Sequence, residues 1–561
     1  MKKIINRKNL ILLFLTVLLF LFVGCNGTPP INHVPNITSM PINTATVETL
    51  YTYDVNATDS DADILTYALA VNPLGMTINS STGVISWTPT SSQTGDYNVT
   101  VEVSDGEFQD TQTFVITVQL TVTVKPVHNI TQSVYYATIQ AALNDANSGD
   151  TIEVANGVYN ESITFPSGKV IYLESIDGSA STMIEGLDDK YTITCNGAQQ
   201  GTDIRGFTIC HKSGDSGAGL YNTNGSVKIT VCNISGNVST KAGGGICNYK
   251  ATLTIFGTNI SENWAATSGG GILNDQGTLN ITGGSTISYN STDYGGGVCN
   301  YHGTLTIIGA SIIAHNSATI NGGGIINDHG TLTVTGLSTV SENSALASGG
   351  GIYNDHGTAT VTGGSVISEN SAVTDGGGIY NDDGTATVTD VSTVSENSAH
   401  ASGGGIFNSY GNLTITGSTI SENSTDTDAK WCNGGGICNS HGTLTVTQGS
   451  IISENSTYYW GGGICNSDGI LTVTGSIISE NSAYSGGGIF LCDGVLTTDI
   501  IGGSSSADTA KFNTFINNKK EDTVSSGQHI RGPLNDVSDI EPLCNLGDLH
   551  SNFPYNYYTP N

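Results

Sequence analysis

Residues 349–374 read GGGIYNDHGTATVTGGSVISENSAVT, and variants of this stretch occur eleven times between Gly217 and Phe490. The third glycines of successive copies are 25 to 27 residues apart, except for one step of 31 residues. A fixed period in this range indicates a solenoid, in which each repeat packs only on its neighbours. The third glycines are Gly219, Gly245, Gly271, Gly297, Gly324, Gly351, Gly378, Gly405, Gly436, Gly463 and Gly488.

Each repeat contains three runs with the composition of a β-strand. In the copy quoted above they are GIYN (351–354), TATVT (358–362) and SVISEN (365–370), and all are bounded by Gly, Asn, Asp or Ser. None of the runs reaches the ~10 residues that a helix would need. Three strands and three turns per repeat predict one coil of a parallel β-helix, with coils stacked about 4.8 Å apart.

Equivalent positions in stacked coils should form ladders along the solenoid axis. The residue after the glycines is Ile or Val in ten copies and Leu in one, so we expect it to point inward. Two Asn positions also recur, one after GGGIx and one after the SE of SEN, and their side-chain amides can bond to the Asn above and below. Both Asn positions also suit turns, because Asn tolerates the left-handed region.

The GGGIxN and SEN motifs resemble the repeats of chlamydial polymorphic outer-membrane proteins. More broadly, they resemble the right-handed parallel β-helix of pectate-lyase-like proteins. The resemblance implies an all-β solenoid but no single function, since that fold serves lyases, hydrolases, adhesins and phage tailspikes.

The composition is strongly acidic. Asp and Glu number 48 against 17 Lys and Arg, for a formal net charge of −31. This charge opposes binding to nucleic acid or to anionic lipid, and it suits solubility and cation binding. The eleven cysteines are not spaced as zinc ligands are.

The N-terminus predicts export. Residues 1–24 have a basic start and an apolar run that is too short for a permanent membrane helix. The string FVGC at 22–25 resembles a bacterial lipobox, which implies cleavage before Cys25, lipidation of its thiol and an outward-facing protein anchored in the cell envelope. Simple secretion is the alternative. Residues 25–35 are expected to form a tether.

Residues 36–119 are predicted to form a separate β-sandwich. Strand-like runs recur at short spacing, and the stretch from Pro73 to Gly106 resembles bacterial putative-Ig, cadherin-like modules. Trp87, Tyr97 and Phe114 are the expected core.

Four carboxylates of this module are candidate calcium ligands. Asp59, Asp61 and Asp63 alternate in one loop and Asp105 lies in a second loop, and hard oxygen ligands in flexible loops suit Ca²⁺. The alternative interpretation is a solvated acidic turn without an ion.

The β-helix is assigned to residues 128–518, with an N-terminal cap. Ile139, Ala142, Leu143 and Ala146 lie at helical spacing, which predicts an amphipathic helix over the open end of the solenoid. An insertion of about four residues precedes Gly434, and residues 519–561 are expected to form a C-terminal cap or tail.

Three ladders of the solenoid are candidates for ligand binding. An acidic ladder occupies the position before the second Asn, and its carboxylates either form a solvated turn edge or bridge cations. An aromatic or apolar ladder follows the inward Ile, and it is either an exposed binding stripe or a second buried stack. His302, His329, His356 and His441 lie in turns, where a metal site is the less favoured interpretation. The acidic ladder includes Glu342, Glu369, Glu396, Glu422, Glu454 and Glu480, and the aromatic ladder includes Tyr353, Tyr380 and Phe407.

No catalytic residue is predicted. The lyase resemblance implies an Arg or Lys base, and the sequence contains neither between Lys250 and Lys430. Arg205 and Lys212 in the early coils are the remaining candidates, although a single Arg on a strand is usually a surface residue.

These observations predict a monomeric surface lipoprotein that binds a polysaccharide or a partner cell, with Ca²⁺ as a structural cofactor. A polysaccharide lyase or hydrolase is the second hypothesis, with its site in the early coils or near Trp431. A structural spacer of the cell envelope, without a specific ligand, is the third.

Overall fold

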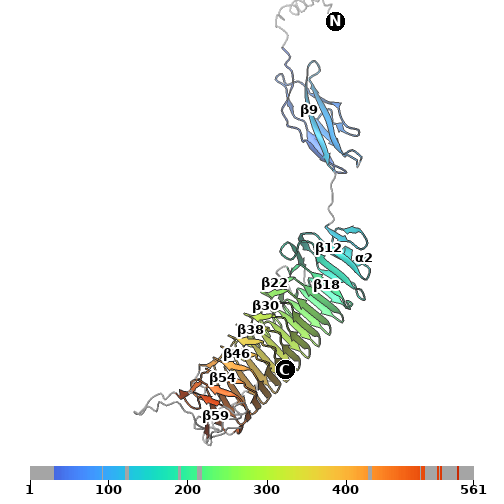
Figure 1. Cartoon of the computed structure of the whole chain (residues 1–561). Helices are drawn as coiled ribbons and strands as arrows, with labels where there is room; N and C mark the ends of the chain where they lie inside the picture. Colours follow the sequence, from blue (N-terminus) through green and yellow to red (C-terminus); the bar gives the residue numbers. More distant parts are fainter. Residues whose placement is uncertain are drawn as a thin grey trace, which may run out of the picture. The chain divides into compact units, whose positions relative to one another are not determined.

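The computed structural model describes residues 31–90, 92–119, 126–187, 191–211, 218–426, 432–492 and 494–498, and three short strands beyond residue 513. The chain divides into two compact units, Met1–Val124 and Lys125–Asn561. Both are all-β, and α2 (Ile139–Asp145) is the one helix among the described residues (Figure 1). The predicted signal segment and Cys25 lie outside the described residues.

The first unit is a small β-sandwich with an Ig-like arrangement. A four-stranded sheet runs in the order β2-β9-β8-β5 and a three-stranded sheet in the order β3-β7-β6, while β1 pairs with β4. The strands are β1 (Asn36–Ile37), β2 (Thr44–Thr46), β3 (Tyr51–Asp54), β4 (Ala57–Thr58), β5 (Thr66–Val71), β6 (Thr77–Ile78), β7 (Val84–Trp87), β8 (Gly95–Ser104) and β9 (Gln109–Gln119).

The core of this unit forms from the inward positions of alternating strands. Along β8 the buried residues are Val99, Val101 and Val103, as the two-residue period of a strand requires. Trp87 and Phe114 are buried as predicted, and Tyr97 is partly buried with its ring edge-on to Trp87 at 5.5 Å between centroids. Burying a large aromatic ring removes apolar surface from water, which stabilises the folded unit by about 25 cal/mol per Å² of buried surface.

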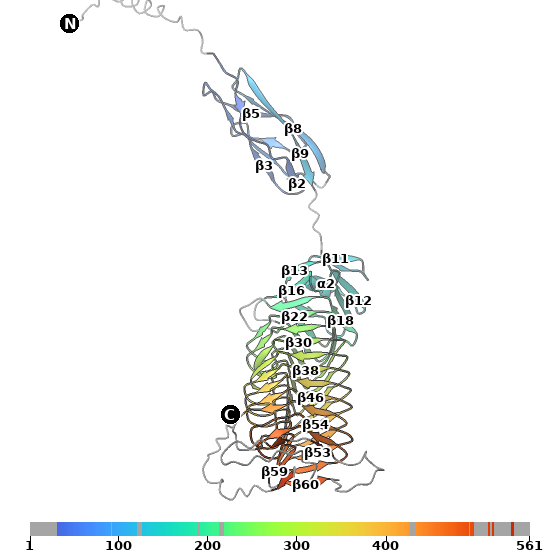
Figure 2. The same cartoon turned by 60° about the vertical axis from the view of Figure 1, so that its left-hand side comes forward.

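The second unit is the predicted parallel β-helix. One coil contains β44 (Ile379–Asp382), β45 (Thr385–Thr389), β46 (Thr393–Ser395) and the two-residue β47 (Ser398–Ala399). Three of these strands correspond to the three predicted runs, and β47 is an addition that the sequence did not indicate. Figure 2 shows the coils stacked along the solenoid, with equivalent strands side by side.

The stacked strands form three long sheets and one short sheet. Sheet 1 contains β45 and runs from β11 (Val134–Tyr136) to β60 (Val495–Thr498) in 16 strands. Sheet 2 contains β46 and runs from β13 (Gly157–Asn160) to β61 (Thr514–Ile516) in 14 strands. The short sheet contains β47 and has eight strands.

Sheet 3 contains β44 and also has 14 strands, and it carries the candidate groove described below. Its strands are β14 (Ile163–Phe165), β17 (Ile193–Asn196), β20 (Leu220–Thr223), β24 (Ile246–Tyr249), β28 (Ile272–Asp275), β32 (Val298–Tyr301), β36 (Ile325–Asp328), β40 (Ile352–Asp355), β44, β48 (Ile406–Ser409), β52 (Ile437–Ser440), β55 (Ile464–Ser467), β59 (Ile489–Cys492) and β63 (Ile540–Pro542).

The inward ladders pair in register as the repeat predicts. Ile352 pairs with Ile379 and Ile379 with Ile406 on consecutive strands of sheet 3, and all three are at most 1% exposed. Burying one such side chain contributes about 1.5–3 kcal/mol. Because every coil repeats this contact, the core is a continuous column along the solenoid.

The two Asn ladders are buried, and their amides bond between coils. Asn354 Nδ2 donates to Asn381 Oδ1 at 2.7 Å and to the carbonyl of Gly357 at 3.0 Å. In the second ladder Asn370 donates from both its backbone N and Nδ2 to Asn397 Oδ1, at 3.0 and 2.9 Å. The predicted amide stacks are therefore confirmed, and they satisfy polar groups that would otherwise be buried unpaired.

The glycines allow close approach between coils. A Cβ on Gly377 would lie 2.3 Å from the carbonyl oxygen of Ser398 and 2.4 Å from that of Gly404. Gly376 before it has φ +66°, a conformation that L side chains rarely adopt. The GGG motif is therefore required by the backbone.

The predicted cap helix is present. Thr138 Oγ1 accepts from the Ala141 backbone N–H, and the Glu161 carboxylate accepts from the first two N–H groups of α2. Ile139, Ala142 and Leu143 are buried against the first coils, so α2 covers the end of the hydrophobic column. At the other end, β61 pairs with β57 (Ile477–Ser479), so the stacking of sheet 2 continues to Ile516.

Candidate functional site

The acidic loop of the Ig-like unit gathers oxygen atoms. One ligand oxygen each from Asp59, Asp61 and Asp63 can be chosen within 4.8 Å of one another, and this is the single group of that kind among the described His, Cys, Asp and Glu residues. Asp59 Oδ1 accepts a hydrogen bond from the backbone N–H of Asp61 at 2.7 Å, and this bond closes a turn in the loop.

The residues before the first strand complete this cluster. His33 donates its backbone N–H to Asp61 Oδ2 at 2.7 Å, and Asn32 Nδ2 donates to Asp105 Oδ2 at 3.1 Å. The N–H groups of Glu107 and Phe108 donate to the other oxygen of Asp105. These hydrogen bonds lower the pKa of Asp61 and of Asp105, so both carboxylates stay ionised.

Two oxygen atoms of the cluster are shielded from solvent and have no hydrogen-bond partner among the described residues. They are Asp59 Oδ2 and Asn32 Oδ1. A buried acceptor without a donor is costly, and a hard cation held by the Asp triad would offer Asp59 Oδ2 a partner. The triad of Asp59, Asp61 and Asp63 could therefore hold Ca²⁺. Asp105, the fourth predicted ligand, does not belong to this group of three and is bonded to Asn32 instead.

A groove runs along the outer side of sheet 3, parallel to the solenoid axis. Its floor is the row of residues that follow the inward Ile, which we call the floor row. A cavity of about 430 Å³ lies over four of its positions, Leu273, Cys299, Ile326 and Tyr353. This row is the aromatic or apolar ladder of the sequence, and it is recessed between two walls instead of forming an exposed stripe.

One wall of this axial groove is a row of four carboxylates and one tyrosine, which we call the carboxylate row. It occupies the position two residues after the floor row, so the pleat places both on the same side of the sheet. The opposite wall, the rim row, comes from the residue before each glycine triplet. The carboxylate row is Asp275, Tyr301, Asp328, Asp355 and Asp382, and the rim row is Ser268, Tyr294, Asn321, Ser348, Asp375 and Ser402.

Aromatic rings stack along the floor. Tyr353 and Tyr380 are 4.8 Å apart between centroids with planes 7° apart, and Phe407 follows at 5.0 Å. Because the ring faces are used between coils, the groove receives ring edges and hydroxyl groups. The Tyr353 hydroxyl donates to Asp382 Oδ2 at 3.1 Å, which links floor and wall.

Burial in the groove raises the pKa of two carboxyl groups. Desolvation raises the pKa of Asp375 to about 6, although hydrogen bonds from Ser402 partly oppose this. Desolvation also raises the pKa of Asp382, with smaller contributions from the neighbouring Asp355 and Asp383 carboxylates. Asp382 on the carboxylate row and Asp375 on the rim row therefore both interact with the floor residue Tyr380.

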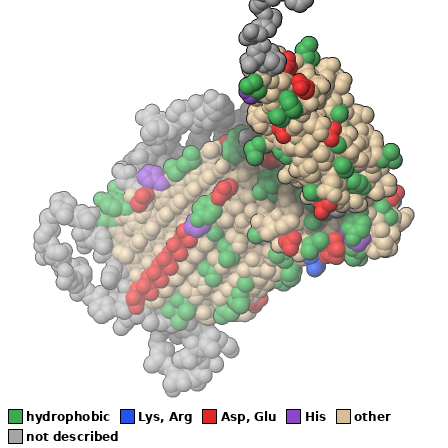
Figure 3. Space-filling model, turned by 90° about the horizontal axis from the view of Figure 1, so that it is seen from above, with side chains coloured by type: hydrophobic (Ala, Val, Ile, Leu, Met, Phe, Trp, Pro, Cys, Tyr) green, Lys and Arg blue, Asp and Glu red, His purple; other side chains and the backbone are tan. Residues whose placement is uncertain are grey.

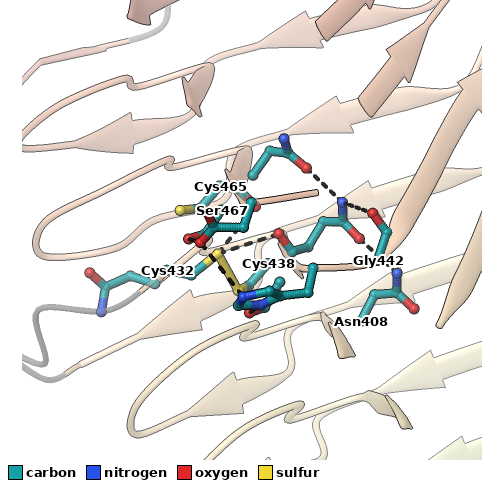
Figure 4. Close-up of a disulfide and its surroundings, with 12 residues drawn as sticks. Asn408, Cys432, Cys438, Gly442, Cys465 and Ser467 are labelled. Atoms are coloured by element: carbon teal, nitrogen blue, oxygen red, sulfur yellow. Dashed lines mark hydrogen bonds and ion pairs between the residues drawn. A yellow bond between two sulfur atoms is a disulfide. The ribbon is translucent and has the colours of Figure 1, made fainter. Parts of the chain in front are cut away.

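A disulfide closes the groove at its C-terminal end. Cys432, just after the inserted segment, bonds to the floor residue Cys438 on β52, with Cα atoms 5.8 Å apart (Figure 4). Cys465 follows in the next coil, and Trp460 stacks on Phe490 at 5.5 Å over the same floor. The disulfide ties the segment before Gly434 to the floor row. Residues 427–431, including Trp431, lie outside the described residues.

The Glu ladder lies on a different edge of the solenoid. Glu342, Glu369 and Glu396 are exposed turn residues with φ between 54° and 56°. Figure 3 shows the acidic ladder as a straight stripe along the solenoid. His315 precedes Glu342 in the stripe, with Nδ1 at 3.2 Å from its carboxylate. The geometry agrees with a solvated turn edge.

The His ladder occupies exposed left-handed turn positions next to the carboxylate row. His329 and His356 stack with parallel rings 4.9 Å apart, and the Nδ1 atom of each ring contacts the preceding Asp. The hydrogen bond to Asp355 raises the pKa of His356. These rings therefore pair with carboxylates at the outer border of the groove.

The early coils contain a small mixed-charge depression. About 280 Å³ on the outer side of sheet 1 is lined by Tyr172, Glu174, Asp203 and Arg205, with Thr151 and Leu173. Arg205 is paired with Asp203 at 3.3 Å and remains half exposed. Lys212 lies outside the described residues.

Sequence reasoning missed two features of these sites. The carboxylate row was not recognised, although the Asp after Asn in IIND and IYND recurs in register and could have indicated it. Asn32 was assigned to the tether, and no local pattern marks its contact with Asp105, 73 residues away. Among the described residues, no helix is long and apolar enough to cross a membrane.

Comparison with known proteins identifies the first unit only. Residues 34–119 match the family described as Putative Ig domain. No curated protein matches the chain. The match covers a small part of the sequence, so it assigns that segment and not the whole chain to a family.

Solved structures give short, distant matches. A putative alpha-galactosidase from Bacteroides fragilis is 25% identical over 15% of this chain and 17% of its own, with a TM-score of 0.14. Human protocadherin-24 EC1-2 is 20% identical over 15% and 44%, with a TM-score of 0.13. An endo-fucoidan hydrolase of glycoside hydrolase family 107 is 19% identical over 23% and 18%, with a TM-score of 0.16. The chain spans less than half the length of each of these proteins.

Proposed function

We propose that this chain is a surface protein that binds an extended polysaccharide in the axial groove, without cleaving it. The observation that supports this most is the continuity of the groove, whose floor and walls come from equivalent positions in successive coils from β28 to β44. A polymer with a repeating unit can make the same contact several times, so that weak contacts add up. Apolar floors with hydroxyl and carboxylate walls suit sugar rings, which have both C–H faces and hydroxyl groups.

A binding role also agrees with the distribution of charge. The carboxylates of the wall occupy equivalent positions on strands of sheet 3, which suits repeated contacts with a polymer. The basic side chain implied by the lyase resemblance is not present in the sequence between Lys250 and Lys430. Partner-cell adhesion through such a glycan would follow from the same contacts.

In this proposal Ca²⁺ is a structural cofactor of the Ig-like unit. The unpartnered oxygen of Asp59 supports this role, together with the three clustered carboxylates. The ion would stabilise the folded unit by mass action. Export and lipid attachment at Cys25 would hold the protein at the outer side of the cell envelope, as a monomer.

A polysaccharide-degrading enzyme is the second candidate, and the depression around Arg205 favours it. That depression brings a cationic side chain, two carboxylates and Tyr172 together on one face. Cleavage there would require the Arg205 guanidinium or a carboxylate to act on a bound sugar, separately from the axial groove.

A glycan array with the mature chain carrying Cys25→Ser tests binding and cleavage together. We expect retention of a glycan without release of reducing or unsaturated ends. Ser268→Trp, which fills the groove from its rim, should abolish retention, while Thr387→Trp on sheet 1 should not. Retention that survives Ser268→Trp would contradict the groove, and product release that Arg205→Ala abolishes would establish the second candidate.

Calcium binding is tested by thermal unfolding with Ca²⁺ or a chelator. At a Ca²⁺ concentration 100 times its Kd, the Ig-like unit should gain about 2.7 kcal/mol of unfolding free energy. Asp59→Asn should remove most of this gain, whereas Asp96→Asn on β8, outside the cluster, should retain it. An equal gain in both variants would contradict the assigned ligands.

A further inference from the structure

The walls of the axial groove carry negative charge only. Asp275, Asp328 and Asp355 line the cavity of about 430 Å³ directly. Asp382 continues the same row in the next coil, and its carboxylate reaches back to the Tyr353 hydroxyl at 3.1 Å. Asp375 lies on the opposite rim, so acidic groups flank the floor on both sides.

Lys250 lies near Asp275, the first carboxylate of the row, and the later carboxylates have no Lys or Arg in their own coils. The sequence contains neither Lys nor Arg from 251 to 429, which spans all the coils that form the open groove. Further along the wall the neighbouring basic side chains are His329 and His356, whose Nδ1 atoms contact Asp328 and Asp355. The His302 ring lies 5.1 Å from that of His329, at a tilt of 43°. Asp383 adds another carboxylate 3.8 Å from the far nitrogen of His356.

The charge pattern decides which polysaccharides the groove can accept. A uronic acid or sulfated polymer would bring one negative charge after another against this wall. Like charges in contact repel, and the repulsion is stronger near a protein surface than in bulk water because the effective dielectric constant is lower there. A polymer with protonated amines would instead form charge-assisted hydrogen bonds with the carboxylates at successive coils.

The direction of the groove disfavours an extended peptide. The groove crosses the strands of sheet 3, whose backbone groups are already bonded to the coils above and below. A peptide lying along the groove would find no edge strand to pair with, and its backbone N–H and C=O groups would be desolvated without partners. Sugar hydroxyls can use the side chains that the groove offers, namely Tyr and Ser hydroxyls and Asp carboxylates.

We infer that the ligand of the axial groove is a polysaccharide whose sugars carry free amino groups. The ammonium groups lie against the carboxylate row, the sugar rings cover the apolar floor, and the rim hydroxyls bond to the ring hydroxyls. The Cys432–Cys438 disulfide and Trp460 limit the bound segment at the C-terminal end of the groove. This inference rests on the proposed polysaccharide-binding function.

The test compares three hexasaccharides by calorimetric titration of the mature chain carrying Cys25→Ser. They are a glucosamine hexamer, its fully N-acetylated counterpart and a galacturonate hexamer. We expect the glucosamine hexamer to bind at least tenfold more tightly than the acetylated one and the galacturonate hexamer not to bind. Raising the salt concentration should weaken the binding of the glucosamine hexamer, because the contacts are ionic.

Two double variants of equal charge distinguish the groove from general electrostatic attraction. Asp355→Asn with Asp382→Asn removes two groove carboxylates, and Glu369→Gln with Glu396→Gln removes two carboxylates from the stripe on another edge. Each lost charge-assisted contact should weaken binding about tenfold, whereas the Glu variant should change binding less than twofold. Thermal unfolding of both variants checks that they are folded.

The outcomes separate the two proposals. Equal binding of the amino and the acetylated hexamer would overturn the amino-sugar inference and leave a neutral polysaccharide in the groove. Binding of an oligolysine peptide as tight as that of the glucosamine hexamer, with equal losses in both double variants, would reduce the effect to nonspecific attraction of cations and would also overturn the inference. If no glycan of the array binds, the proposed function itself fails.

Discussion

At the scale of single residues, the solenoid holds some charged residues in environments or backbone conformations that are unfavourable for them. The Asp375 carboxyl group is partly buried on the rim of the groove, and Glu396 has a left-handed backbone conformation with φ of 56°. Neither position contributes to the hydrophobic column. Substitutions at both positions can therefore measure the cost of burying a carboxylate and of a left-handed backbone conformation while the fold remains intact.

Asp375 should make stability depend on pH. Its pKa in the folded chain is raised to about 6 by desolvation, from an unfolded value near 3.8. The folded state then binds more protons between these values, so stability falls as pH rises from about 4 to about 6 and is constant above that. Asp375→Asn should remove this fall and add up to about 3 kcal/mol at neutral pH. Urea unfolding of both proteins at pH 4 and pH 7 measures the difference, and an equal pH dependence in the two would contradict it.

Glu396 should be replaceable with a gain in stability. Asn tolerates the left-handed conformation better than Glu, and the substitution also removes repulsion from Glu369 and Glu422. We expect Glu396→Asn to add about 0.5–1 kcal/mol to the free energy of unfolding. Glu396→Gln removes the charge and keeps the backbone cost, so it isolates the electrostatic part. Loss of stability in Glu396→Asn would contradict this account.

At the scale of elements, the strands depend on polar ladders as much as on the apolar column. Asn381 is fully buried, accepts from Asn354 Nδ2 and donates to Asn408 Oδ1, each at 2.7 Å, and also donates to the carbonyl of Gly384. One Asn therefore serves its own turn and both adjacent coils.

Removing one rung of the Asn ladder should be costly. Asn381→Ala leaves the Asn408 Oδ1 and the Gly384 carbonyl without this donor in a buried site, which we expect to cost about 2–4 kcal/mol. Thr387→Ala, on the outer side of β45 in the same coil, should cost less than about 1 kcal/mol. Denaturant unfolding of both variants measures the contrast, and similar losses in the two would argue against the ladder as a source of stability.

At the scale of the whole molecule, negative charges greatly outnumber positive charges. The net charge is −31, and the coils between Lys250 and Lys430 carry acidic groups and His without a single Lys or Arg. The solenoid is held by its column and its ladders against the mutual repulsion of its surface carboxylates.

Salt should therefore stabilise the solenoid. Raising the ionic strength from 0.01 to 0.1 M shortens the Debye length from about 30 to about 10 Å, which screens repulsion between coils. We expect the unfolding temperature of the solenoid to rise by several degrees over this range, as followed by circular dichroism. A chain in which Glu342, Glu369 and Glu396 are all changed to Gln should respond less. An unfolding temperature that is independent of salt would contradict the role of repulsion.

Much of the fold follows from the repeat. The glycine period, the inward Ile and the two Asn positions are local patterns whose physical requirements are met within one or two coils, and the cap helix is marked by its apolar spacing. The all-β class, the stacked coils and the buried Asn ladders could therefore be predicted. The two-residue fourth strand could not, because a run such as Ser398–Ala399 has no pattern of its own.

The candidate sites depend on contacts between residues that are far apart in the sequence, which local sequence patterns do not reveal. The sequence predicted one candidate site from Asp59, Asp61, Asp63 and Asp105, but Asn32 contacts Asp105 only because the chain folds back over 73 residues. It identified Tyr353, Tyr380 and Phe407 as one ladder without deciding whether the ladder is exposed. The walls on either side of it come from different parts of each coil, so the tertiary structure alone makes that ladder the floor of a groove. The physical reason is that hydrogen bonding and apolar periodicity act between near neighbours and stacked repeats, whereas a concave surface depends on how separate turns approach one another.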